Sequence, residues 1–94
     1  MILHIINQSP TASDTLGLCL SVADKNTGIL LIEDGVYANQ TMIFDSATKK
    51  GVTFYLLKAD MQARGIQPVP ELNVVDYEGF VDLVCQYQAT QTWL

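Results

Sequence analysis

The chain has 94 residues, a net charge of −5 at pH 7 and 49% hydrophobic residues. This length suits a single domain, residues 1–94, with one hydrophobic core, and excludes a second domain. Ten acidic residues stand against five scattered basic ones, so we expect no direct binding to nucleic acid.

The apolar runs are short and the cysteines are few. The longest runs, ILHII at 2–6 and GILLI at 28–32, fall far below the ~20 residues of a membrane helix. No basic-then-apolar signal segment opens the chain, and we therefore expect a cytoplasmic protein without a membrane anchor. Cys19 and Cys85 lack CxxC spacing, which predicts two free thiols.

The first half of the chain alternates strand and helix signals. Residues 2–6 predict a strand buried on both faces, ended by the turn-prone NQSP. A helix follows Pro10 and stops near KNTG at 25–28, because apolar residues recur at helical spacing: Ala12, Leu16, Cys19, Leu20 and Ala23 form a stripe, with Val22 beside it. GILLI at 28–32 predicts the second buried strand, and EDGVYA connects it to the next element.

The second half repeats this alternation. Residues 38–49 carry a weak helical signal, and 52–57 predict the third strand. KADMQARG at 58–65 predicts a short helical turn closed by its glycine. A short strand at 73–75 leads into a final helix capped by Asp76, and that helix is expected to line one face with Tyr77, Phe80, Val81, Val84 and Tyr87.

Buried strands that alternate with helices predict a three-layer α/β/α fold with a mostly parallel sheet, flavodoxin-like in outline. Functional groups in such sheets gather at the carboxyl ends of the strands. Here those ends are followed by NQSP, EDGVYA and KADMQARG. We expect these three loops to share one edge of the sheet.

Motifs for cofactors and metals are missing from the sequence. It has neither a GxGxxG nor a Walker-type GxxxxGK[ST] motif, and one histidine with two distant cysteines offers no recognised metal spacing, so we expect no cofactor. His4 lies between isoleucines and is interpreted as a packed, hydrogen-bonded core residue. Glu33 and Asp34 are interpreted as capping or solvated acids, because no second fixed carboxylate pairs with them.

The two cysteines differ in their expected exposure. Cys19 lies in the centre of the first helix's apolar stripe, and this pattern favours a buried core thiol. Cys85 lies nearer the edge of the last helix's stripe and is the more reachable thiol. An apolar stripe can also face a neighbouring subunit instead of its own core, which leaves a working role for Cys19 open.

Five segments together resemble the DsrH/TusB family in order and spacing: ILHIINQSP at 2–10, LLIEDGVYA at 30–38, ADMQARG at 59–65, VVDYEGFVDL at 74–83 and TQTWL at 90–94. The resemblance implies a DsrE-like fold and a place in a cytoplasmic sulfur-relay complex. Its expected partners are DsrE/TusD-like and DsrF/TusC-like subunits in a heterohexamer, together with a DsrC/TusE-like sulfur carrier. The relay would serve tRNA wobble 2-thiouridine synthesis or sulfur oxidation.

The resemblance also bears on the thiols. DsrH-type chains carry a cysteine in the first helix, and Cys19 matches that position, so it is predicted to be the sulfur-handling thiol. The principal persulfide-bearing cysteine of such complexes belongs to the DsrE or TusD partner, and Cys85 is interpreted as structural. Two alternatives remain: a scaffold subunit without chemistry of its own, and a stand-alone flavodoxin-like module that binds a small ligand through EDGVYA. Surplus aromatic residues favour an oligomer: Tyr37, Phe44, Tyr87 and Trp93.

Overall fold

The sheet has five strands in the part of the chain that the structure, a computed structural model, describes: residues 2–12, 14–40 and 50–93. The strand order is β4-β3-β2-β1-β5 and every pairing is parallel. The strands are β1 (Ile2–Ile6), β2 (Gly28–Leu31), β3 (Thr53–Leu57), β4 (Leu72–Val75) and β5 (Ala89–Trp93). The predicted α/β architecture with a parallel sheet is confirmed.

The connections between these strands are helical. They are α1 (Thr15–Val22), the 3-10 helix η1 (Glu33–Gln40), α3 (Lys58–Ala63) and α4 (Tyr77–Gln86). The expected EDGVYA connection thus begins a 3-10 helix, and the weak helical signal predicted at 38–49 lies outside the described residues from 41 onward. Within the described ranges, no helix has the length and apolarity needed to cross a membrane.

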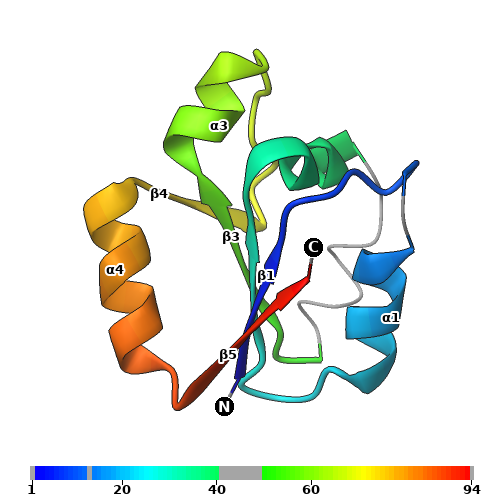
Figure 1. Ribbon diagram of the computed structural model, residues 1–94, viewed down its shortest axis with the longest axis vertical. Coiled ribbons are helices and arrows are strands. Elements are labelled where there is room, and N and C mark those ends of the chain that lie inside the picture. The colour runs from blue at the N-terminus through cyan, green and yellow to red at the C-terminus, as the bar shows by residue number, and fades with distance from the viewer. Residues whose placement is uncertain (1, 13, 41–49, 94) are drawn as a thin grey trace.

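The strand order explains how the layers are built. From β1 to β4 each crossover steps in the same direction across the sheet, and right-handed crossovers then place α1, η1 and α3 on one face. The last crossover returns past β1 to β5, which places α4 on the other face. Figure 1 shows α4 and α1 on opposite sides of the sheet.

Each face of the sheet packs its own core because strand side chains alternate between the faces. The α1-side core contains, among others, Ile6, Leu16, Cys19, Ile29, Leu31, Val36, Phe54 and Leu56. The α4-side core is smaller and consists of Leu3, Ile5, Leu30 and Leu83, with partly buried side chains around them. Among the described residues, one helix therefore covers a face of the sheet that is as wide as the face covered by three.

The strand β5 was not predicted from the sequence. It pairs with β1 over its whole length, from Ile2 opposite Ala89 to Ile6 opposite Trp93. Its sequence ATQTW lacks the apolar run that revealed the other strands, because β5 is an edge strand whose first four residues are exposed. Backbone pairing with β1, rather than side-chain burial, holds most of this strand in place.

The final helix begins as predicted, but its expected face was wrong. Asp76 caps α4, since its Oδ1 accepts a hydrogen bond from the Gly79 N–H at 2.8 Å. Leu83 is the buried residue of the helix, with Phe80 and Tyr87 packed beside it against the sheet. Three other residues of the expected face are instead exposed: Tyr77, Val81 and Val84. The helix is apolar around much of its circumference, and only the arc near Leu83 reaches the sheet.

The first helix is shorter than predicted. It starts at Thr15, because residues 9–12 form a turn in which the Ala12 N–H donates to the Ser9 carbonyl at 3.1 Å. Ala12 is consequently exposed and outside the helix, and Val22 at the other end is exposed as well. The middle of the predicted stripe is confirmed, with Leu16 and Cys19 buried.

Candidate functional site

The carboxyl ends of the central strands meet at one edge, as predicted. The backbone N–H of Ile32 donates to the Ile6 carbonyl at 3.0 Å, and the Glu33 N–H donates to Asp60 Oδ2 at 2.8 Å. Gly35 lies so close to the end of β1 that a Cβ there would overlap the Ile6 carbonyl oxygen. Contacts from the three loops therefore converge on the start of η1.

An arginine joins two of these loops. Arg64, just after α3, donates from Nε to Asp34 Oδ1 at 3.1 Å, and its Nη2 lies 3.0 Å from the same oxygen. Its Nη1 is 3.8 Å from Asp60 Oδ1. Asp60 in turn accepts the N–H of Glu33, a non-glycine residue at φ 48°. The left-handed backbone at Glu33 is thus held by a carboxylate that is itself paired with a cation.

The end of β1 contains a polar atom without a partner. Asn7 follows Ile6, and its side-chain oxygen is buried without a hydrogen bond from any residue in the described ranges. A buried acceptor in this state is destabilising by about 1–3 kcal/mol. It is available to a donor from water, a ligand or a partner chain.

Cys19, the predicted sulfur-handling thiol, lies in the middle of α1 and is 0% exposed within the α1-side core. Burial raises the pKa of its thiol from 9.0 to about 11. No polar side chain among the described residues forms a hydrogen bond with its sulfur. A nucleophilic thiol needs the opposite environment, namely access and a lowered pKa. In this conformation Cys19 has the environment of a structural residue.

His4 forms its hydrogen bond with the last strand of the sheet. It is 7% exposed, and Nε1–H of Trp93 donates to its Nδ1 at 3.0 Å. Because indole is only a donor, His4 must be neutral with its proton on Nε2. Burial lowers the pKa of His4 below its ordinary 6.5, which favours the same neutral form. The prediction of a packed, hydrogen-bonded core histidine is confirmed.

Cys85 lies on the opposite side of the sheet from Cys19. It is exposed on α4, as its position near the edge of the apolar stripe predicted. The structure therefore does not bring the two thiols together, and no dithiol site forms. Within the described ranges, no three histidine, cysteine or carboxylate side chains converge in a way that would hold a metal ion.

Sequence reasoning missed how polar residues fasten the loops. The pairing of Asp34 with Arg64 was hidden, although both residues lie in the segments EDGVYA and KADMQARG that were singled out. Asn39 was also missed: its amide donates to the Gln67 carbonyl at 2.7 Å and its oxygen accepts the Val69 N–H at 2.8 Å. A buried asparagine that hydrogen-bonds the backbone of a proline-containing loop leaves no periodic pattern in the sequence.

The strand order, the two unequal cores and the linked loops at the carboxyl edge define a small parallel α/β protein. Solved structures share this fold. The solution structure of protein Tm0979 from Thermotoga maritima matches with a TM-score of 0.72 and 22% identity, covering 94% of this chain and 95% of that one. The crystal structure of the ychN protein from E. coli matches with a TM-score of 0.75 and 18% identity, covering 98% and 97%.

Sequence comparison identifies the family. Residues 8–90 match the model of the family described as DsrH like protein. A protein named TusB from Buchnera aphidicola subsp. Baizongia pistaciae is 30% identical over 100 residues, covering 97% of this chain and 99% of the relative. A protein TusB from Erwinia tasmaniensis is 30% identical over 95 residues, with the same coverage. The chain belongs to the DsrH/TusB family, as its sequence segments predicted.

Proposed function

We propose that this chain is a subunit of a cytoplasmic sulfur-relay complex of the TusBCD or DsrEFH type, in which it acts as a single DsrH/TusB-like domain. The observation that carries the proposal is the near full-length similarity to proteins named TusB, which covers 97% of this chain and 99% of the relatives. DsrE/TusD-like and DsrF/TusC-like subunits would be its partners, and a DsrC/TusE-like protein would be the sulfur carrier.

The exposed apolar residues support a subunit that assembles with others. On α4, the large hydrophobic side chains of Tyr77 and Val81 are more than half exposed. Of the aromatic residues expected at interfaces, Tyr37 is exposed, whereas Tyr87 and Trp93 pack within the chain and Phe44 lies outside the described residues. A stand-alone ligand-binding module would have less reason to expose this apolar surface.

The prediction that Cys19 handles sulfur in the relay depends on whether its thiol can become accessible. Its thiol is enclosed by the α1-side core, so sulfur transfer at this residue requires α1 to move in the assembled complex. If α1 stays closed, the chain serves as a scaffold, and a partner's cysteine carries the persulfide. The enclosed thiol and its raised pKa support the scaffold role for the chain as it is folded here.

Two measurements on one preparation test the proposal. The chain is co-expressed with the DsrE/TusD-like and DsrF/TusC-like chains of the same organism and sized by analytical ultracentrifugation. A stable complex is expected, and a separate species of 10.4 kDa would contradict the proposal and favour the stand-alone module. The complex is then treated with a persulfidated donor and analysed by mass spectrometry. A gain of one sulfur that is lost in Cys19→Ser but kept in Cys85→Ser would assign the transfer to Cys19.

The biological branch requires a different readout. Deleting the gene and measuring 2-thiouridine in tRNA by mass spectrometry tests the role in wobble thiolation. Loss of the modified nucleoside, restored by the wild-type gene, is the result expected for a TusB-type function. Unchanged 2-thiouridine together with impaired oxidation of reduced sulfur would assign the chain to the other branch.

A further inference from the structure

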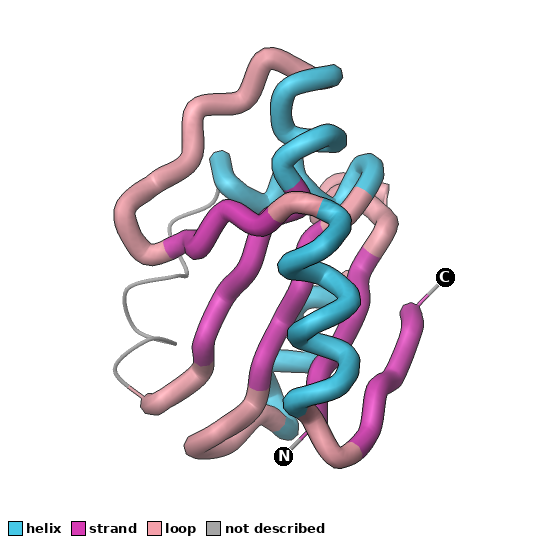
Figure 2. The backbone as a smooth tube through the Cα atoms, turned by 90° about the vertical axis from the view of Figure 1, so that its left-hand side faces the viewer, coloured by secondary structure: helices cyan, strands magenta, loops and turns pink. Residues whose placement is uncertain are grey.

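Helix α4 presents an apolar stripe to solvent in addition to the side that packs on the sheet. Tyr77, Val81 and Val84 recur at a spacing of four and three residues, which aligns them along the helix. Their exposed fractions are 63%, 61% and 39%. We call these three residues the α4 outer stripe. Figure 2 shows α4 crossing in front of the middle of the sheet, with no further helix of the described residues beside it on this face.

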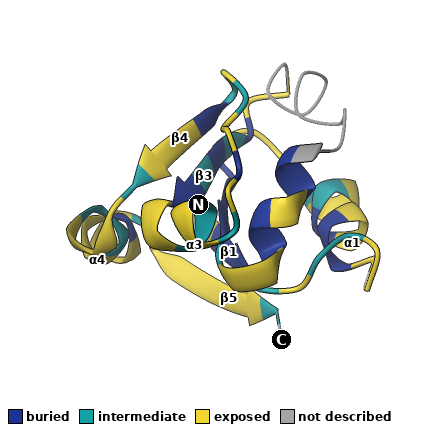
Figure 3. Ribbon diagram, turned by 90° about the horizontal axis from the view of Figure 1, so that it is seen from above, coloured by how far each residue is buried: buried dark blue, intermediate teal, exposed yellow. Residues whose placement is uncertain are grey.

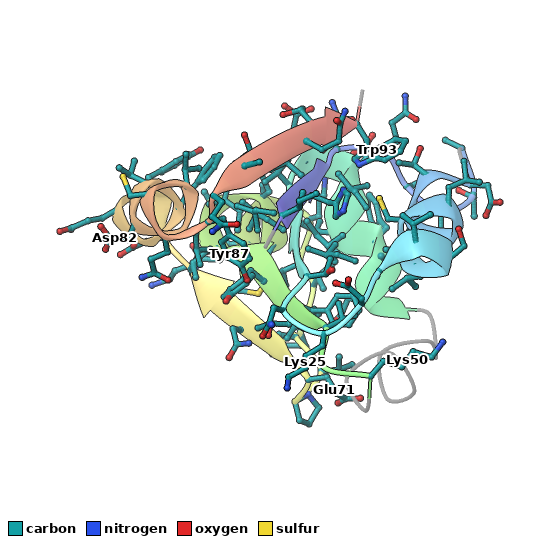
Figure 4. The ribbon with its side chains drawn as sticks, turned by 90° about the horizontal axis from the view of Figure 1, so that it is seen from below. Lys25, Lys50, Glu71, Asp82, Tyr87 and Trp93 are labelled. Atoms are coloured by element: carbon teal, nitrogen blue, oxygen red, sulfur yellow. The ribbon has the colours of Figure 1, made fainter. Side chains whose placement is uncertain are left out.

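Carboxylates lie beside this stripe. Glu78 and Asp82 are both exposed and stand four residues apart, so their like charges are neighbours on the helix surface. Figure 4 shows Asp82 pointing away from the sheet, whereas Tyr87 of the same segment points toward it. A cation from a binding partner placed next to both carboxylates would relieve this repulsion.

The charge in the last third of the chain has a single sign. After Arg64 the sequence contains no lysine, arginine or histidine, and its acids are Glu71, Asp76, Glu78 and Asp82. The labelled lysines Lys25 and Lys50 lie well away from α4 (Figure 4). Nothing in the chain's own C-terminal segment neutralises the carboxylates beside the outer stripe.

These observations discriminate between possible occupants of the surface. A two-fold dimer in which two α4 helices pack antiparallel through the outer stripe would place Glu78 and Asp82 of one copy beside the same residues of the other, and such like-charge contacts are unfavourable. A different protein with an apolar patch rimmed by lysine or arginine would bury the stripe and pair the acids. Exposed residues continue along the chain from the end of α4 into β5, which is coloured mostly as exposed in Figure 3, so a partner has room beyond the helix itself.

We propose that the α4 outer stripe and its flanking carboxylates form the docking surface for a partner subunit that has a basic rim around an apolar patch. This inference rests on the proposed function, because the partner is sought among the subunits of the relay complex. It adds the face of the chain that binds and the charge of the surface it binds. The thiol Cys19 is on the other side of the sheet and takes no part in this contact.

The test uses matched variants on the two helices. Val81→Glu places a charge in the outer stripe, and Asp82→Lys reverses the charge beside it. Val22→Glu and Asp14→Lys make the same changes at exposed positions on and next to α1. All four variants are co-expressed with the DsrE/TusD-like and DsrF/TusC-like chains. Circular dichroism and thermal unfolding verify that each variant is folded.

Affinity for the partner subunits is expected to fall at least about tenfold in Val81→Glu and Asp82→Lys, and to change less than about twofold in the two α1 controls. Binding of the wild type should also weaken as salt rises, and this salt dependence should be smaller in Asp82→Lys. Wild-type affinity in both α4 variants would refute the proposed docking surface without contradicting membership in the relay complex. Failure of the wild-type chain to join these subunits would refute the proposed function and this inference with it.

Self-association is measured in the same experiment. Ultracentrifugation of the chain alone at low and high salt is expected to show no dimer that depends on α4. A dimer that is abolished by Val81→Glu and retained in Val22→Glu would assign the surface to a second copy of this chain, and would overturn the proposal of a basic partner.

Discussion

The reactivity of Cys19 gives a direct test of the site geometry. A thiol with a pKa of about 11 is ionised in about one molecule in a thousand at pH 8, whereas a thiol at the ordinary 9.0 is ionised in about one in ten. The reactive thiolate is therefore depleted about 100-fold. Complete burial of the side chain slows the reaction further, because the reagent must wait for α1 to open.

Two single-cysteine variants turn this into an experiment. Cys85→Ser leaves only the buried thiol of Cys19, and Cys19→Ser leaves only the exposed thiol of Cys85. Native protein is labelled with iodoacetamide at pH 8 and quantified by mass spectrometry over time. We expect Cys19 to react at least ~100-fold more slowly than Cys85, and both to react at similar rates in urea. Comparable rates in the native protein would refute the argument that the core encloses and deactivates Cys19.

Three further predictions follow from buried and paired groups. The pKa of His4 is lowered in the folded state, so the unfolded chain takes up a proton first as pH falls below about 6.5. The melting temperature, measured by the fluorescence of the one tryptophan, should therefore fall as pH falls through this range. In His4→Leu the melting temperature should depend less on pH. In urea titrations, Leu83→Ala should reduce the free energy of unfolding by about 2–4 kcal/mol, because Leu83 is buried, and Val81→Ala by less than about 0.5 kcal/mol, because Val81 is exposed. Equal effects of the two substitutions would contradict the conclusion that Leu83, and not Val81, faces the sheet. Asp60→Ala should be destabilising by about 1 kcal/mol, since the Glu33 N–H loses its acceptor, whereas Glu33→Gly should relieve the positive φ and raise stability by up to about 1 kcal/mol.

The elements that were predictable from the sequence are those buried by their own side chains. The apolar runs ILHII and GILLI predicted β1 and β2 correctly because both faces of these strands are buried in a core. Asp76 was recognisable as a cap because its carboxylate acts within one turn of the helix. Strand β5 escaped prediction because it is defined by hydrogen bonds to β1, about 90 residues away in the chain, and not by its own composition.

The candidate site divides in the same way. Periodicity along α1 correctly placed Cys19 in the core, and the parallel sheet correctly brought three loops to one edge. The pairing of Arg64 with Asp34 and of Trp93 with His4 joins residues 30 and 89 positions apart. Such pairs depend on which strands become neighbours. The prediction of which residues of α4 face the sheet was also wrong in part, because an apolar residue that faces a partner and one that faces the core look alike in a helical pattern.

The strand order explains both why the thiol of Cys19 is buried and why one side of α4 is exposed. Three crossovers cover the α1 side, which encloses Cys19. In the part of the chain that the structure describes, α4 is the one helix on the other side, and it carries an apolar stripe beside carboxylates. A subunit that needed Cys19 as its working group would have to open its better packed face. A subunit that binds through α4 can do so without any rearrangement. The fold thus favours a contribution made through the surface of α4, and sulfur chemistry at Cys19 would require a partner that first moves α1.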